Sequence, residues 1–213
     1  MPAPRVPSNI SDWKASFEGV VKPSLYEVTF AGGGFETVMQ AFIQHAGWDS
    51  TYRKKLTVLC ETASFPGEAI STQPNRIYGP IREFAYEKLY SGDLSLIFRL
   101  DHDMSLRRFF TAWQQHINEA DTADFSYYND YVCDIGVFQY PTKQSEGPIG
   151  TGADGTVIQG PIDDTPIYGV RIVEAYPKSV GPIEVGYEQR DTYMKQQVDF
   201  AFRRWEEIPL SQL

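Results

Sequence analysis

Alternation of apolar and other residues predicts β-strands along much of the chain. In the clearest run, residues 94–100, every second side chain points to the same face, and that face holds Leu94, Leu96, Phe98 and Leu100. The preceding Ser91-Gly92-Asp93 has the composition of a hairpin turn. Weaker patterns of the same kind predict further strands at 25–30, 56–62, 82–90, 131–140, 167–175 and 195–205.

Two other segments repeat their apolar residues with the period of an α-helix. Residues 35–47 carry one apolar stripe and end at Gly47; the stripe consists of Phe35, Val38, Met39, Phe42, Ile43 and Ala46. Residues 103–117 carry a second stripe, formed by Leu106, Phe109, Phe110, Trp113 and Ile117. Asp103 or Ser105 could supply the N-cap of this second helix.

About seven strands and two helices indicate a mainly β fold, an antiparallel sandwich or barrel with flanking helices. We expect an N-terminal arm over residues 1–21, proline-rich at its start, and a single β domain over 22–213. Turns are expected at 31–34, 65–67 and 176–182, and a long Gly/Pro-rich loop at 146–166.

The composition of the chain narrows the range of functions that it could have. Of 213 residues, 42% are hydrophobic, and the net charge of −9 disfavours tight binding along a phosphate backbone, which requires clustered Lys and Arg. Two cysteines are too few for a disulfide scaffold or a four-cysteine zinc site. Without a signal sequence or a long apolar run, the chain is expected to be a soluble protein made in a reducing cytoplasm.

No constellation of catalytic, cofactor-binding or metal-binding residues is expected. His102 lies between Asp101 and Asp103, where helix capping is a more natural role than metal binding. The glycines of 150–160 lack the Lys-Ser/Thr of a phosphate loop, and the nearby Asp154, Asp163 and Asp164 do not match a calcium loop. The other histidines, His45 and His116, lie in helical segments, and no nucleophile elbow occurs.

An aromatic run at 125–131 (FSYYNDY) leaves two interpretations open. It could be a platform on which sugars stack, or it could be a half-buried strand edge or a subunit contact.

Four segments in order carry a family resemblance. They are KPSLYEVTF (22–30), CETASFPG (60–67), FAYEKLYSGDLSLIFRLDHDMSLRRFFTAWQQHI (84–117) and YGVRIVEAYPKSVGPIEVGYEQRDTYMKQQVDFAFRRWE (168–206). The match as a whole extends over about two-thirds of the chain. Their order and spacing resemble the tail tube proteins of contractile-tailed phages, whose relatives include baseplate tube initiators and the tubes of contractile injection systems.

The resemblance implies a structural protein without catalysis or cofactor. Such subunits form hexameric rings whose sheets join into one continuous barrel, and the rings stack into a hollow tube. It implies partners of five kinds: other copies of the chain, the sheath, the tape-measure protein, and baseplate and tail-terminator proteins. The expected place is the virion tail, assembled in the host cytoplasm without a membrane, with DNA passing through the lumen unbound.

An acidic lumen would repel DNA phosphates, so the charge of −9 has a functional interpretation; ordinary solubility is the alternative. The candidates for lumen-facing residues are Glu61, Glu83, Glu87 and Asp93. The candidates for the core are Leu94, Leu96, Phe98, Leu100, Phe109, Trp113, Phe200 and Phe202.

The chain departs from the family pattern through insertions at about 31–55 and 140–166, which we expect to contact neighbouring rings or the sheath. A baseplate tube initiator and an injection-system tube remain alternatives within the resemblance. Outside it, a monomeric β-sandwich that binds carbohydrate through 125–131 is the alternative of another class, and an enzyme ranks third.

Overall fold

The computed structural model describes residues 21–46, 52–76, 78–119, 123–141, 150–151, 157–158, 165–186 and 193–209. Seven antiparallel strands form one hydrogen-bonded path, β1-β6-β9-β10-β5-β2, with β11 added to β9. Their bounds are β1 Tyr26–Ala31, β2 Cys60–Ala63, β5 Leu94–Arg99, β6 Cys133–Gln139, β9 Tyr168–Val180, β10 Lys195–Ala201 and β11 Arg204–Glu207. The mainly β, antiparallel fold class is confirmed.

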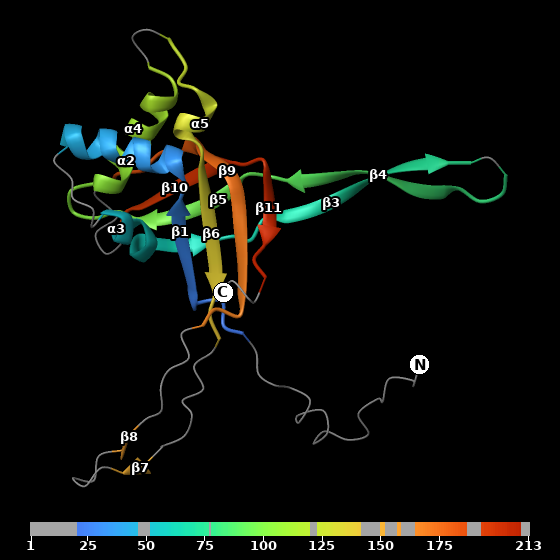
Figure 1. Ribbon diagram of the computed structural model, residues 1–213, viewed down its shortest axis with the longest axis horizontal. Helices are drawn as coiled ribbons and strands as arrows, with labels where there is room; N and C mark the ends of the chain where they lie inside the picture. The colour runs from blue at the N-terminus through green and yellow to red at the C-terminus, as the bar shows by residue number, and fades with distance from the viewer. Residues whose placement is uncertain are drawn as a thin grey trace.

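The path bends at β9 into two crossing layers (Figure 1). The first half of β9 pairs with β6 and β11, which together with β1 form the first sheet. The second half pairs with β10, which together with β5 and β2 forms the second sheet. One long strand therefore belongs to both sheets and joins them.

Helices close one end of the sandwich (Figure 1). They are α2 Gly33–Ala46, α3 Tyr52–Leu59, α4 Ser105–Ile117 and α5 Tyr128–Tyr131. In α4 the predicted stripe is buried at Leu106, Phe109, Phe110 and Trp113. Trp113 is fully buried, its ring lies 5.7 Å from Phe35 of α2 and 6.2 Å from Phe200 of β10, and its Nε1 donates to the Tyr131 carbonyl at 3.0 Å. The helices thus connect to both sheets through aromatic rings.

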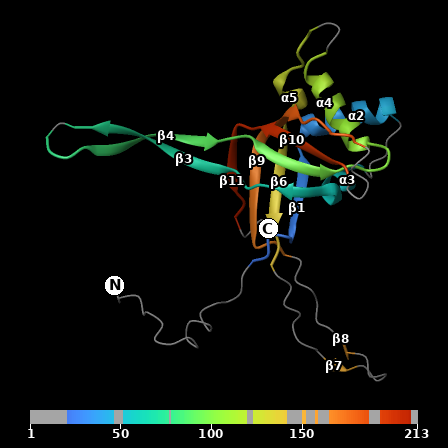
Figure 2. The same cartoon turned by 180° about the vertical axis from the view of Figure 1, so that it is seen from behind.

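Strands β3 Gly67–Asn75 and β4 Arg82–Ser91 form a separate two-stranded sheet, which projects away from the sandwich (Figures 1 and 2). Two short strands, β7 Gly150–Thr151 and β8 Val157–Ile158, pair with each other inside the segment expected to be a loop. Residues 146–149, 152–156 and 159–164 of that loop, and residues 1–20 of the N-terminal arm, lie outside the described residues. No helix of the described part is long and apolar enough to span a membrane.

The expected strand at 56–62 is wrong in its first part, because residues 52–59 form α3 and only 60–63 are β2. Tyr52, Leu56 and Leu59 recur at i, i+4 and i+7, and these three side chains pack on the core, with Leu56 1% exposed. Val58 lies on the other side of the helix and is 78% exposed. The helical period in this stretch outweighs the β-branched residues that suggested a strand.

The C-terminal strands also differ from expectation. A turn was expected at 176–182, but β9 continues to Val180 and pairs with β10. Conversely, the single strand expected at 195–205 is two, β10 and β11, separated at Phe202 and Arg203. Both differences follow from the bend of β9 between the two sheets. The chain that pairs with β9 on both sides of the bend must itself be interrupted there, which separates β10 from β11.

Three smaller corrections concern element starts. The strand expected at 131–140 begins only at Cys133, after α5. The turn expected at 31–34 is confined to Gly32, whose φ is +110°, because α2 begins at Gly33; a Cβ on Gly34 would lie 2.2 Å from the Val132 carbonyl oxygen. Neither Asp103 nor Ser105 caps α4; instead the Asp101 carboxylate accepts from the Ser105 N–H at 2.8 Å, and also from its hydroxyl.

The first insertion does not lie wholly at the surface. On α2, the residues Phe35, Val38, Met39 and Phe42 are at most 9% exposed and belong to the core. Helix α3 is tied to the start of α4, because Lys55 Nζ donates to Asp101 Oδ2 at 3.3 Å. The apolar side of this insertion therefore packs inside the subunit, and contacts with neighbouring rings or the sheath stay a prediction for its exposed side.

We predict that Trp113→Ala lowers the free energy of unfolding by ~3–5 kcal/mol, because it removes a fully buried indole that packs α4 against α2 and against β10 of the second sheet. Urea denaturation followed by circular dichroism measures this change. Thr111→Ala, at an exposed position of the same helix, is the matched control and should change stability by less than about 0.5 kcal/mol. A loss below ~1 kcal/mol for Trp113→Ala would contradict the packing described here.

Candidate functional site

The projecting β3–β4 hairpin, hereafter the arm, is the largest exposed feature of the described fold (Figures 1 and 2). Its strands pair only with each other. At its root, Trp205 Nε1 donates to the Gly67 carbonyl at 3.4 Å, and the Phe65 ring lies 5.5 Å from that of Tyr168. Anchored at one end, the arm presents both faces to its surroundings.

The two faces of the arm differ in chemistry. Residues paired across a hairpin lie on the same face, so the pairs Gln73–Phe84 and Ala69–Leu89 share one side. The register shift at Ser71/Thr72 leaves Tyr86 as the extra residue of a bulge, and strand alternation places it on the side of Phe84. We call this side the apolar face; its large apolar residues are Phe84 (55% exposed), Tyr86 (74%) and Leu89 (45%), and Glu87, opposite Ser71, is a charged residue on the same side.

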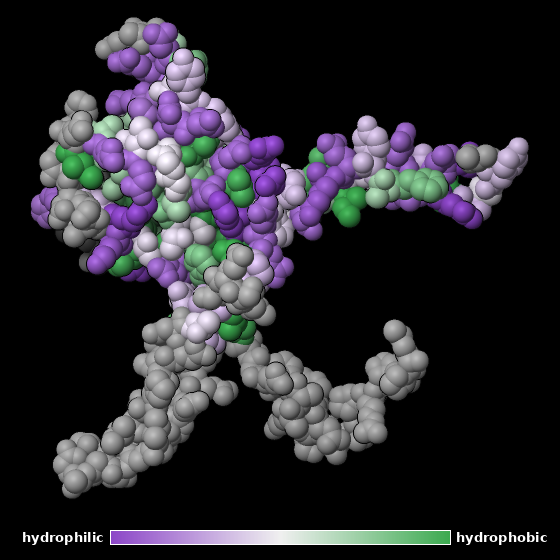
Figure 3. All heavy atoms as spheres, viewed as in Figure 1, coloured by the Kyte–Doolittle hydropathy of each residue, from purple (hydrophilic) through white to green (hydrophobic). Residues whose placement is uncertain are grey.

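The opposite face holds polar pairs. Lys88 Nζ lies 2.6 Å from Glu68 Oε2, and Thr72 Oγ1 donates to Glu83 Oε2 at 3.1 Å. Ile70 (63% exposed) and Tyr90 (36%) are its large apolar residues. Figure 3 shows hydrophobic residues along the arm among hydrophilic ones. An isolated hairpin is marginally stable in water, and gathered exposed apolar residues mark an interaction surface.

The four acidic residues expected in a lumen do not lie on one surface. Glu83 and Glu87 lie on the two faces of the arm, opposite Pro74 and Ser71 respectively. Glu61 lies in β2, and Asp93 directly precedes β5. Glu61 and Asp93 lie on the outer face of the second sheet. The residues of this face alternate along the strand with the buried Leu94, Leu96 and Phe98.

Both acids on the outer face of the second sheet are ion-paired. Glu61 Oε1 accepts from Lys195 Nζ and from the Tyr193 hydroxyl, each at 2.8 Å, and Arg99 Nε lies 3.5 Å from Oε2. The Lys195 hydrogen bond, followed by that of Tyr193, lowers the pKa of Glu61. Asp93 Oδ2 accepts from Lys178 Nζ at 2.7 Å, which raises the pKa of that lysine. This face is polar and charged, but its charges are balanced.

The expected core residues divide into two groups. Leu94, Leu96, Phe98, Phe109, Trp113 and Phe200 are at most 1% exposed. Leu100 and Phe202 are only partly buried and pack against the rim of the core. Each lies just beyond the end of a strand, β5 or β10, where coverage by the opposite layer ends.

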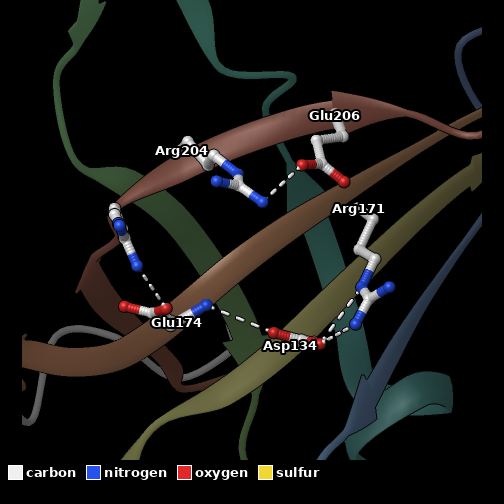
Figure 4. Close-up of polar contacts among 6 residues, drawn as sticks. Asp134, Arg171, Glu174, Arg204 and Glu206 are labelled. Carbon is white, nitrogen blue, oxygen red and sulfur yellow. Dashed lines mark hydrogen bonds and ion pairs between the residues drawn. The ribbon is translucent and has the colours of Figure 1, made fainter.

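A polar cluster that sequence reasoning missed holds the corner of β9 (Figure 4). Asp134 of β6 accepts from Arg171 Nε at 3.1 Å and, through its other oxygen, from the backbone N–H of Glu174 at 3.2 Å. Glu174 has a positive φ of 57°, which is unfavourable for a residue with a Cβ. The hydrogen bond from its N–H fixes this conformation at the point where β9 passes from one sheet to the other.

The Glu174 carboxylate extends the cluster. It accepts from Arg203 Nη1 at 2.8 Å, at the break between β10 and β11, and from the Tyr128 hydroxyl at 3.1 Å. Burial, and then this hydrogen bond, raises the pKa of Tyr128 to about 12. The hydrogen bond to Asp134 likewise raises the pKa of Arg171. Asp134 and Glu174 lie 40 residues apart, and no local pattern in the sequence links them.

Other sequence candidates occupy scattered positions. His102 is fully exposed and contacts only the neighbouring Asp103 in the described interactions, at 3.4 Å. Within the described residues, no three His, Cys, Asp or Glu side chains form a metal-binding group. Cys60 and Cys133 are buried free thiols, and burial raises the pKa of both. Asp154, Asp163 and Asp164, and the side chain of His45, lie outside the description.

The aromatic run 125–131 does not form one continuous platform. Phe125 and Tyr127 are 73% and 85% exposed. Tyr131, in contrast, packs edge-on against Tyr128 and Tyr176, each with ring centroids 5.5 Å apart. Tyr131 therefore stabilises the sandwich, Tyr128 is 43% exposed, and Phe125 and Tyr127 remain mostly on the surface.

A two-sheet sandwich with exposed apolar residues on a projecting arm is typical of proteins that act by assembling with other proteins. The family model for phage tail tube proteins matches residues 21–208, and the chain belongs to this family. The family is structural, so the chain is a non-enzymatic component of the virion tail. No curated protein matches the sequence.

Solved structures support the same fold. The chain is similar to one from the sheath/tube terminator of the PVC extracellular contractile injection system, with 11% identity, a TM-score of 0.55, and coverage of 90% of this chain and 99% of that chain. A chain of the anti-feeding prophage baseplate has 7% identity and a TM-score of 0.53, and the match covers 91% of this chain and 99% of that chain. A chain of the anti-feeding prophage cap has 13% identity and a TM-score of 0.52, and the match covers 90% of this chain and 93% of that chain. At these identities the likeness establishes the fold alone.

We predict that Asp134→Ala lowers the free energy of unfolding by about 1–3 kcal/mol, because the Glu174 N–H and the Arg171 guanidinium lose their shared acceptor. Urea denaturation measures the loss. Asp103→Ala removes an exposed carboxylate and should leave stability within about 0.5 kcal/mol of wild type. Equal stabilities of the two variants would show that the corner does not depend on Asp134.

Proposed function

We propose that this chain is the tube subunit of a contractile tail, forming hexameric rings that stack into a hollow conduit. The observation that carries the proposal is the arm, whose exposed apolar face requires a partner. Family membership and the similarity to chains of tube terminators and baseplates support it. A further similar chain comes from a PVC sheath–tube complex, at 10% identity and a TM-score of 0.50.

An arm that leaves one side of the subunit suits a heterologous contact, in which different surfaces of two copies meet. Contacts of this kind close into rings or continue without limit, and stacking requires the second case. The sheath, the baseplate, the terminator and the tape-measure protein are the further partners in this proposal. Assembly takes place in the host cytoplasm.

In this proposal the conduit passes DNA without binding it. The net acidic charge of the subunits makes the lumen acidic overall, while ion pairs balance the charges of the sheet that is our candidate for the wall. The net charge of −9 supports repulsion of phosphates. Glu61 and Asp93 share the outer face of the second sheet, which is our candidate for the wall, while Glu83 and Glu87 on the arm would reach the lumen only if the arm does. A tube that conducts protein cargo in an injection system would differ in its cargo, not in this architecture.

We predict that the purified protein at high concentration forms six-membered rings or hollow tubes under negative-stain electron microscopy, with light scattering giving the matching mass. A baseplate extract provides a nucleus where one is needed. Strict monomers even with this nucleus would contradict the proposal. A glycan screen would then test the exposed aromatics Phe125 and Tyr127 as a carbohydrate-binding surface.

We predict that the pair Phe84→Asp and Tyr86→Asp reduces tube length at least tenfold and leaves thermal stability nearly unchanged, because both side chains are already exposed in the isolated subunit. Ile70→Asp combined with Tyr90→Asp is the matched control, since it adds the same two charges on the opposite face of the arm. Equal effects on the two faces would show that the apolar face has no special role in stacking.

We predict that Glu61→Lys combined with Asp93→Lys leaves ring formation intact but makes the conduit retain DNA, because a wall of balanced charge becomes strongly basic. Retention of labelled DNA by assembled tubes at low and high salt measures this. Glu36→Lys, on an exposed side of α2, is the control. Unchanged retention would place the lumen on another face.

A further inference from the structure

A groove lies between α2 and α4 and the segment that follows α4. Its volume is about 700 Å³, within the range of pockets that bind drug-sized molecules. Its lining residues are Val38, Ala41, Phe42, Ala112, Gln115, His116, Glu119, Asp124, Phe125 and Ser126. The groove therefore has room for bulky side chains of a partner.

The lining combines an apolar floor with acidic residues. Val38, Ala41 and Ala112 come from facing helices, and the Phe125 ring is 73% exposed. Glu119 and Asp124 are its two charged residues, and neither lysine nor arginine lines it. A suitable partner thus has an apolar surface and carries positive charge.

The end of the arm has this chemistry. Residues 74–82 contain Arg76 and Arg82 and no acidic residue. Tyr78 and Ile81 in the same stretch are 94% and 63% exposed. Burial of the Tyr78 ring and the Ile81 side chain would be favourable, because it removes apolar surface from water. The guanidinium groups of Arg76 and Arg82 can form charge-assisted hydrogen bonds with carboxylates.

The arm projects away from helices α2 and α4, which line the groove, so a subunit cannot place the end of its own arm in its own groove (Figures 1 and 2). We infer that the end of the arm of one copy docks into the α2–α4 groove of a second copy, with Arg76 and Arg82 facing Glu119 and Asp124. Each copy then offers one arm and one groove, and the contact repeats without limit. This inference rests on the proposed function and names the surface that receives the arm.

A second copy fits better than an unrelated partner because both halves of the contact are present in one chain. The arm supplies the apolar and basic half, and the groove supplies the apolar and acidic half. A contact built from complementary charges also sets which surfaces meet.

Charge exchange tests the inference. Arg76→Glu with Arg82→Glu, and separately Glu119→Arg with Asp124→Arg, should each shorten tubes at least tenfold, and all four changes in one chain should restore most of the length. Asp103→Arg, at an exposed position outside the groove, should have no effect. Single sets that still give full-length tubes, or a fourfold variant no better than either set, would overturn the docking while leaving the tube proposal intact. A wild-type chain that forms no rings or tubes would overturn both.

A disulfide gives a second readout that does not depend on the charges. Ile81→Cys and Gln115→Cys in one chain place one thiol on the arm and one in the groove, while the native Cys60 and Cys133 are buried. Oxidation of assembled tubes should yield a ladder of covalent multimers on a non-reducing gel, and either single cysteine variant should yield dimers at most. Tubes of this variant that give no ladder would falsify the docking.

Discussion

The architecture depends on the bend of β9. A single strand of 13 residues supplies hydrogen bonds to both sheets, so the two layers keep a fixed orientation only if the backbone turns at one place. That place is Glu174, where the positive φ has an energetic cost that Asp134 offsets by accepting from its N–H. Arg203 reaches the same residue from the break between β10 and β11, so both strands of the corner bend together.

The aromatic core follows from that bend. Two crossing sheets leave an open end, and α2 and α4 fill it with large rings, which bury much area for each residue placed there. Because the helices occupy this end, the outer faces of both sheets and the whole arm remain available for other contacts. The interior is thus closed within one subunit, and the exposed apolar area is concentrated on the arm.

Periodicity predicted the elements in which one face is buried and the other is exposed. Residues 94–100 and the stripe around Trp113 are such cases, and the structure buries Leu94, Leu96, Phe98 and Trp113 completely. The same signal is absent from β3, which is exposed on both faces and contains Gly67 and Pro74, so this strand was not expected. The corner could not be predicted, because Asp134 and Glu174 meet only through the fold.

The lumen candidates illustrate a related limit. Sequence alternation can show that Glu61 points away from the core, but it cannot show that Lys195, 134 residues later, neutralises it. Ten of the 28 acidic residues, but only four of the 19 basic ones, lie outside the described segments, so the described part has a net charge of −3 (18 acidic against 15 basic residues) and the remainder −6.

Exposed charges act over roughly 8–10 Å at physiological salt, so paired charges on the second sheet give a weak potential a short distance from its surface. A conduit wall with paired charges would not attract phosphates, and it would offer no specific site that binds them. Repulsion of phosphates would then depend on the net charge of the whole subunit more than on the paired charges of this sheet.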